Sequence, residues 1–233
     1  MYKFTKQGSL ERPLCHSSHD DYLRGEEFVR LHPPPSNTEK FDLSNISFVP
    51  NSHTMVDNDG NGNTIRFNDT YGADTSITTN GPVPRDYTYS VTIQDMTPHT
   101  CLAIGFSTSP YPPFRLPGWH HWSAAYHSDD GRLFVCDPND GQAYGKPFRT
   151  GDTVTASIDG RNLAFKRNMT VLPSVLYTLD GNLGIFPIIG ADGPCTVTVD
   201  LLHGSPLFED TDTTDTAPPP YTFVDNLQAH KRI

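Results

Sequence analysis

The segment WSAAYHSDDGRLFVC, residues 122–136, decides the fold class. Two runs rich in apolar and aromatic side chains, 122–127 and 132–136, flank Asp130-Gly131. Asp-Gly between two such runs is a hairpin signal, because the turn needs positive φ and Gly adopts it without steric cost. The segment TVTASIDGRNLAFK, residues 153–166, repeats the pattern around Asp159-Gly160. Both segments therefore predict antiparallel β-hairpins.

Further runs rich in Val, Ile, Phe and Tyr lie on both sides of these hairpins, each bounded by turn residues, while helical periodicity is scarce. Together they predict ten short strands, at 64–67, 75–79, 87–93, 101–107, 122–127, 132–136, 153–158, 162–166, 184–189 and 195–201. So many short strands are typical of a sandwich of two antiparallel sheets. We therefore predict an all-β fold over residues 41–208.

Composition excludes several classes of function. The formal net charge is −10 and Lys and Arg do not cluster, so nucleic acid is not expected as a partner. No segment approaches the roughly 20 apolar residues that cross a bilayer, and the first residues lack the apolar core of a signal peptide. We therefore expect a cytoplasmic chain without a direct membrane span, with reduced thiols at Cys15, Cys101, Cys136 and Cys195.

The two ends of the chain differ in composition from the middle. Residues 1–40 are polar and contain His-Pro-Pro-Pro at 32–35, so we predict an irregular extension with at most one short helix, over 20–30. Residues 209–217, EDTDTTDTA, carry four carboxylates and no large apolar side chain. Such a composition predicts an acidic linker that opens a disordered tail over 209–233.

Directly after the linker, Pro218, Pro219 and Tyr221 form a PPxY pattern, with Pro220 at the free position. Consecutive prolines favour the polyproline II conformation, which fits the aromatic-lined groove of a WW domain. The tyrosine would enter a separate pocket and supply specificity. The alternative is an ordinary Pro-rich tail. The other proline clusters, at 33–35 and 112–113, have no tyrosine at this spacing.

Four segments of the middle region, in order, resemble the SPRY domain: AIGFS (103–107), YPPFRLPGW (111–119), SAAYHSDDG (123–131) and YGKPFRTGD (144–152). Residues 76–84, SITTNGPVP, together with YPPFRLPG, are most similar to the fungal SPRY proteins that act as adaptors of HECT-type ubiquitin ligases at endosome and vacuole. Those adaptors also carry PPxY motifs. The present chain departs from them at Arg167-Asn-Met169, where SPRY domains usually have an Asn-Gly turn, and we expect it to have no N-terminal membrane anchor, which is a second departure.

The resemblance implies an interaction protein and no cofactor. Its sandwich would bind an unidentified protein cargo, its PPxY motif would bind a WW-domain HECT-type ubiquitin ligase, and partners would bring it to the cytosolic face of endosome or vacuole. SPRY domains bind partners through loops at one end of the sandwich, which makes candidates of Tyr111, Arg115, Trp119, His120 and His121. Two structural alternatives stay open: Trp119 as a core residue, and Arg115 as the ion-pair partner of Asp129 or Asp130.

Patterns that could carry other chemistry are weaker. Cys15-His16 with His19 lacks a second pair at zinc-site spacing. Residues 57–63, DNDGNGN, match half of a calcium loop, but the flanks read as strand and favour a turn. His127-Ser128-Asp129 cannot form a relay, since successive strand residues point to opposite faces. We therefore expect neither a metal site nor an enzyme. The rival functions are a plain SPRY scaffold and a lectin-like or hydrolytic sandwich.

Overall fold

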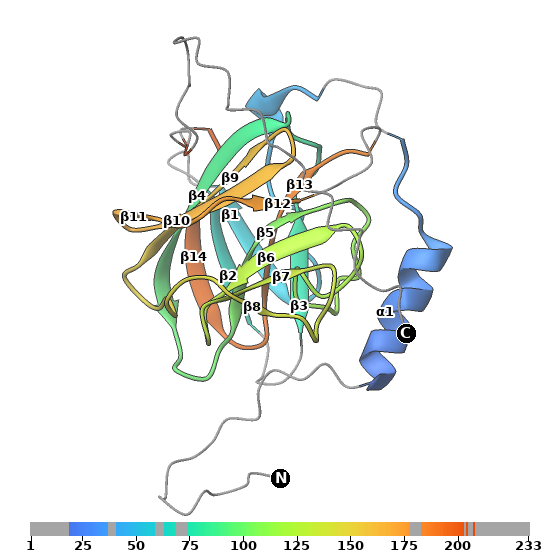
Figure 1. Ribbon diagram of the computed structural model, residues 1–233, viewed down its shortest axis with the longest axis horizontal. Helices are drawn as coiled ribbons and strands as arrows, with labels where there is room; N and C mark the ends of the chain where they lie inside the picture. The colour runs from blue at the N-terminus through green and yellow to red at the C-terminus, as the bar shows by residue number, and fades with distance from the viewer. Residues whose placement is uncertain are drawn as a thin grey trace, which may run out of the picture.

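Two antiparallel sheets pack face to face in the computed structural model (Figure 1). The structure describes residues 19–36, 41–58, 63–68, 74–177, 183–202, 204 and 207. One sheet has the order β1 (Thr54–Asn58), β2 (Asn63–Phe67), β14 (Cys195–Asp200), β4 (Asp86–Met96), β9 (Thr153–Asp159), β10 (Asn162–Arg167) and β11 (Thr170–Val171), with β12 (Val175–Leu176) also paired to β10. The other has the order β3 (Thr75–Thr78), β13 (Phe186–Ala191), β5 (Leu102–Ser107), β6 (Ser123–His127), β7 (Arg132–Val135) and β8 (Gln142–Ala143).

All ten predicted strands are present, with ends shifted by no more than three residues. The two hairpins are also confirmed, and both turn glycines have positive φ, 75° at Gly131 and 57° at Gly160. Their turns differ from the prediction, however. Residues 128–131 connect β6 to β7, and the two-residue loop after Asp159 is Gly160-Arg161. Residues 57 and 58 lie in β1 and pair with β2, as a turn between strands requires, whereas 59–62 lie outside the described residues.

The main core lies between the two sheets. Along β14 the buried residues alternate with partly exposed ones, as expected for a strand with one face on the core. Aromatic and β-branched side chains from both sheets fill the interior, among them Tyr89, Phe106, Phe165 and Ile189. The Tyr89 hydroxyl, buried among them, donates a hydrogen bond to the Gly105 carbonyl at 2.6 Å.

A second, smaller core lies on the outer face of β5 and β6. Every residue of these two strands is buried, so both of their faces are covered. The residues that pack on the outer face come partly from the strands and partly from the segment between them, residues 108–122; they are Cys101, Ala103, Leu116, Trp119 and Ala125, with Phe134 beside them. This segment is therefore part of the folded body.

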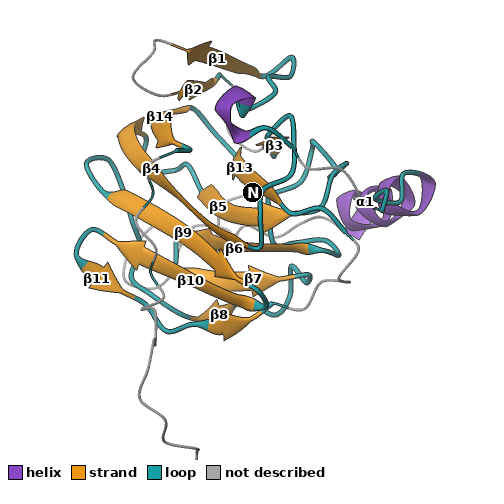
Figure 2. Cartoon of the chain, turned by 90° about the horizontal axis from the view of Figure 1, so that it is seen from above, coloured by secondary structure: helices purple, strands orange, loops and turns teal. Residues whose placement is uncertain are grey.

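One helix, α1 (His19–Leu31), lies to the side of the sandwich in both views (Figures 1 and 2). Acidic residues in its first turn and Arg30 in its last turn suit the helix dipole. The predicted short helix is thus confirmed, and residues 19–31 of the N-terminal extension are not irregular. The remaining short helix, η1 (Leu43–Asn45), is a single 3-10 turn.

Candidate functional site

The segment that joins β5 to β6, residues 108–122, is the candidate interaction loop, and many hydrogen bonds fix it. The Ser76 amide donates to the Pro113 carbonyl at 2.9 Å, and the Gly118 amide donates to Ser123 Oγ at 2.9 Å. At φ 89°, Gly118 permits a sharp bend, and a Cβ there would lie 2.8 Å from Phe134 Cβ. The loop is therefore held tightly on the outer face of the sheet.

Four of the five predicted partner-binding residues are buried, so the prediction that they offer a contact surface is wrong for those four. Tyr111, Arg115, Trp119 and His120 all face the folded body, and only His121 of the set is exposed. The Tyr111 hydroxyl donates to the Leu116 carbonyl at 2.7 Å. The physical reason is that the loop covers a second core, whose formation buries the large aromatic and cationic side chains of the loop.

Arg115 has the most unusual position in the loop, because its guanidinium is 0% exposed. It pairs with Asp74 at 3.7 Å, so the expected pairing with Asp129 or Asp130 is wrong. It also lies 4.9 Å from the centroid of the Trp119 ring, a cation–π contact. Burial lowers the pKa of Arg115 and raises the pKa of Asp74 to about 7, although the attraction of the pair opposes both shifts. The guanidinium of the loop therefore faces a half-buried carboxylate at ion-pair distance.

A chain of hydrogen bonds links this guanidinium to helix α1. Arg115 Nε donates to His120 Nε2 at 3.0 Å, which makes that nitrogen an acceptor and places the imidazole proton on Nδ1. His120 Nδ1 then donates to Glu26 Oε1 at 2.9 Å. Tyr22 stacks on the imidazole with the centroids 5.4 Å apart, and Gly25 faces the ring. Burial lowers the pKa of His120, which favours this neutral form. The helix is therefore anchored to the loop.

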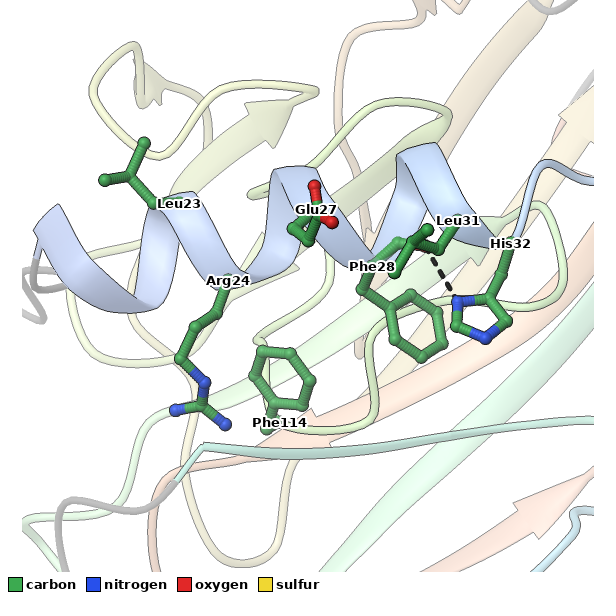
Figure 3. Close-up of a pocket in the computed structure, with 7 residues that line it drawn as sticks. All are labelled: Leu23, Arg24, Glu27, Phe28, Leu31, His32 and Phe114. Atoms are coloured by element: carbon green, nitrogen blue, oxygen red, sulfur yellow. Dashed lines mark hydrogen bonds between the residues drawn. The ribbon is translucent and has the colours of Figure 1, made fainter.

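Beside this anchor, α1 and the tip of the loop form an open groove of about 460 Å³ (Figure 3). Leu23, Phe28, Leu31 and Phe114 supply its apolar surface, and the remaining lining residues are Arg24, Glu27 and His32. The Arg24 guanidinium lies 4.3 Å from the centroid of the Phe114 ring, which Phe28 meets edge-on. Leu23 and Leu31 are 51% and 57% exposed. Hence the groove holds the accessible apolar surface that the buried loop residues do not provide.

Sequence reasoning missed this groove. Its one available signal was the pair Phe28 and Leu31, three residues apart at the C-terminal end of the predicted helix, a spacing that brings two side chains together on neighbouring turns. Nothing in the sequence showed that Phe114 would meet that pair. Pro218, Pro219 and Tyr221 lie outside the described residues, and so do Cys15 and His16. Within the described ranges, no helix combines the length and the apolar character needed to cross a membrane.

Comparison with solved structures identifies the fold as that of the SPRY domain. A crystal structure of a human SPRY domain matches with a TM-score of 0.59 and 24% identity, over 68% of this chain and 99% of that one. The SPRY domain of human HERC1 matches with a TM-score of 0.51 and 16% identity, over 66% of this chain and 96% of the other. The two sheets described above are therefore a SPRY-type sandwich.

The sequence is similar to that of fungal proteins named ssh4. Those of Aspergillus clavatus and Sclerotinia sclerotiorum are each 32% identical, over 79% and 78% of this chain. A SPRY domain-containing protein of Schizosaccharomyces pombe is 37% identical over 120 residues, 49% of this chain and 30% of its own length. The chain spans 38% and 37% of the two ssh4 proteins. No protein-family model matches it.

Proposed function

We propose that this chain is an adaptor that binds a protein cargo through its SPRY sandwich and recruits a WW-domain HECT-type ubiquitin ligase through Pro218, Pro219 and Tyr221. The observation that carries the proposal is the combination of a SPRY fold with a PPxY pattern in one chain. The similarity to fungal ssh4 proteins agrees with the segments that resemble the fungal SPRY adaptors. Ubiquitin-dependent sorting or degradation of the cargo would be the outcome.

The groove between α1 and Phe114 is the surface that we assign to the cargo. Apolar side chains line it together with Arg24 and Glu27, which carry charges of opposite sign and pair with Asp21 and Arg30 on the helix. Exposed apolar surface with a polar rim is typical of protein contacts. The exposed His121, whose ring centroid lies 6.2 Å from that of Trp122, stays a candidate for the same role.

The PPxY pattern is separated from the sandwich by the acidic residues 209–217. Nine residues can span up to roughly 30 Å at about 3.3 Å each, enough to hold a WW domain clear of the sandwich. A single such site binds weakly, so a second contact or a shared membrane surface would raise the effective concentration. We place the complex at the cytosolic face of endosome or vacuole, reached through partners.

Binding of recombinant WW domains to the full chain tests the ligase side. Wild type should bind and Tyr221→Ala should lose most of the affinity, because the tyrosine fills the specificity pocket. Pro220→Ala is the matched control: it lies between the same neighbours, at the free position of the pattern, and should bind nearly as well as wild type. Equal binding by wild type and Tyr221→Ala would refute recruitment through this motif.

A second pair of variants tests the cargo side. Leu31→Glu puts a charge on the groove, whereas Met169→Glu puts one on an even more exposed apolar residue in the β10–β11 turn, where Met169 is 93% exposed. Proteins cross-linked to the full chain in cells should disappear with Leu31→Glu and persist with Met169→Glu. If they persist with Leu31→Glu, the groove assignment is wrong. If the cross-linked proteins are lost with Leu31→Glu but no ligase is found among them, the chain acts as a plain SPRY scaffold.

A further inference from the structure

Three side chains of different chemistry lie close together where the start of β5 lies beside the end of β6. Ala103 of β5 pairs with His127 of β6. Cys101 lies two residues before Ala103, and Asp129 lies two residues after His127. Because successive side chains of a strand point to opposite faces, both lie on the face that His127 occupies. Ser128 points the other way, and its Oγ accepts a hydrogen bond from the Leu102 amide at 2.8 Å.

Two of the distances among the three groups are close to those between ligands of one metal ion. Cys101 Sγ lies 3.6 Å from His127 Nδ1 and 3.2 Å from Asp129 Oδ1, and the three ligand atoms all lie within 4.8 Å of one another. A tetrahedral zinc ion with bonds of about 2.3 Å to sulfur and about 2.1 Å to nitrogen and oxygen needs separations of roughly 3.4–3.6 Å. Small side-chain movements would bring all three onto one ion.

The imidazole is already oriented for metal binding. His127 Nε2 lies 2.8 Å from the Pro117 carbonyl, an acceptor only, so Nε2 carries the proton and donates it. The lone pair of Nδ1 therefore faces Cys101 and Asp129. Trp119 and Phe134 pack against the ring, with centroid distances of 5.8 and 4.4 Å. A backbone carbonyl behind a ligating histidine is the usual outer contact of a zinc site, because it fixes the ring and its tautomer.

We infer that Cys101, His127 and Asp129 form a binding site for one zinc ion, with a water molecule as fourth ligand. A thiolate, an imidazole and a carboxylate suit zinc, whereas calcium and magnesium prefer oxygen ligands alone. On binding, the Cys101 S–H bond is replaced by an S–Zn bond and the proton leaves to the solvent. Cys101 and His127 are buried, and the half-buried Asp129 is the side from which the ion would enter.

The zinc would have a structural role. It would join the start of β5 to the end of β6, and through the Pro117 carbonyl it would hold the loop that carries Arg115 and His120. The site was invisible in the sequence, since Cys101 stands far from the His127-x-Asp129 pair and no second cysteine or histidine lies at zinc-site spacing. The pairing of β5 with β6 alone brings them together.

Cobalt(II) is the probe that tests this site, because a thiolate ligand gives it a charge-transfer band and tetrahedral geometry gives it intense visible bands. The full chain, stripped of metal by a chelator, should show both with one equivalent of cobalt and lose both when zinc is added. Cys101→Ser should abolish the charge-transfer band. Cys136→Ser, which removes a cysteine outside the cluster, should retain it. A wild type without the band, or a band that survives Cys101→Ser, would overturn the inference.

Thermal unfolding with zinc provides a second measurement that does not depend on the folding of Cys101→Ser. At a free zinc concentration 100 times the dissociation constant, the melting temperature of the wild type should rise by roughly 5–10 °C. Asp129→Asn removes a charge from a half-buried position, so it should fold as the wild type does and bind zinc at least about tenfold more weakly. An equal rise in Asp129→Asn would show that zinc binds elsewhere.

Discussion

Replacing Gly25 by Ala should loosen helix α1, although the same change stabilises most helices. Gly25 lies in the middle of α1 and faces the His120 imidazole. An added Cβ would lie 2.1 Å from His120 Nε2 and 2.4 Å from Cε1, closer than any real contact allows. The imidazole would have to move away, and with it the hydrogen bonds to Arg115 and Glu26.

The two opposing contributions can be compared. In an open helix interior, Ala is favoured over Gly by about 0.8–1 kcal/mol. A hydrogen bond to a charged group contributes about 1.5–3 kcal/mol, and at least one of the two bonds of His120 would be lost. The net effect is a weakening of α1 docking by roughly 1–2 kcal/mol, a factor of about 5–30 in the docking equilibrium. The sandwich core does not contain Gly25 and should keep its stability.

Amide hydrogen exchange over residues 19–31 measures the docking directly, because local opening exposes these amides without global unfolding. Gly25→Ala should accelerate their exchange by roughly 5–30-fold, while exchange in β4 and β5 stays as in the wild type. In a His120→Ala background the ring is gone, so Gly25→Ala should there slow the exchange of α1. Slower exchange of Gly25→Ala in the wild-type background would refute the steric argument.

Two further predictions concern acid stability and a turn. The pKa of His120 is lowered by burial, so its contribution to α1 docking is complete above pH about 6.5 and is lost as the pH falls below that value. The rate of amide exchange in α1, corrected for its intrinsic pH dependence, should therefore rise between pH 7 and pH 5 in the wild type, and it should rise less in His120→Asn. Asp74, whose pKa is raised to about 7, stabilises the folded state more as the pH falls, and it does so equally in both proteins. Asn168 has φ 52°, donates to Asp152 at 2.7 Å and accepts from the Thr153 amide at 2.9 Å. Asn168→Ala should lower the free energy of unfolding by about 1–3 kcal/mol in urea titration, and Asn168→Gly, which tolerates that φ, by less.

The strands could be predicted because their signals are local. Alternation of apolar residues and the turn glycines Gly131 and Gly160 fix the hairpins, and Asn168, in the segment where SPRY domains usually have an Asn-Gly turn, also has positive φ. The two-residue strands β8, β11 and β12 escaped prediction, since so short a segment has no periodicity to detect. β1 escaped prediction because it has few apolar residues. All of its residues pair with β2.

The candidate site could not be predicted to the same extent, because its geometry is set by distant segments. Arg115 depends on Asp74 and, through His120, on Glu26 of the helix. One signal of the second core was present: residues 101–107 and 123–127 have no polar alternation, which is typical of strands covered on both faces. That signal would have predicted burial of the loop, but neither the partner of Arg115 nor the groove beside α1.

The strand order also determines when the sandwich can assemble during synthesis. β14 lies between β2 and β4, and β13 lies between β3 and β5, so the last two strands among the described residues occupy inner positions, one in each sheet. Until residue 200 has left the ribosome, the nascent chain presents four unpaired strand edges, which are prone to association with other chains. The two sheets can therefore be completed only after β13 and β14 have been made, and chaperones that cover strand edges should raise the yield of the domain.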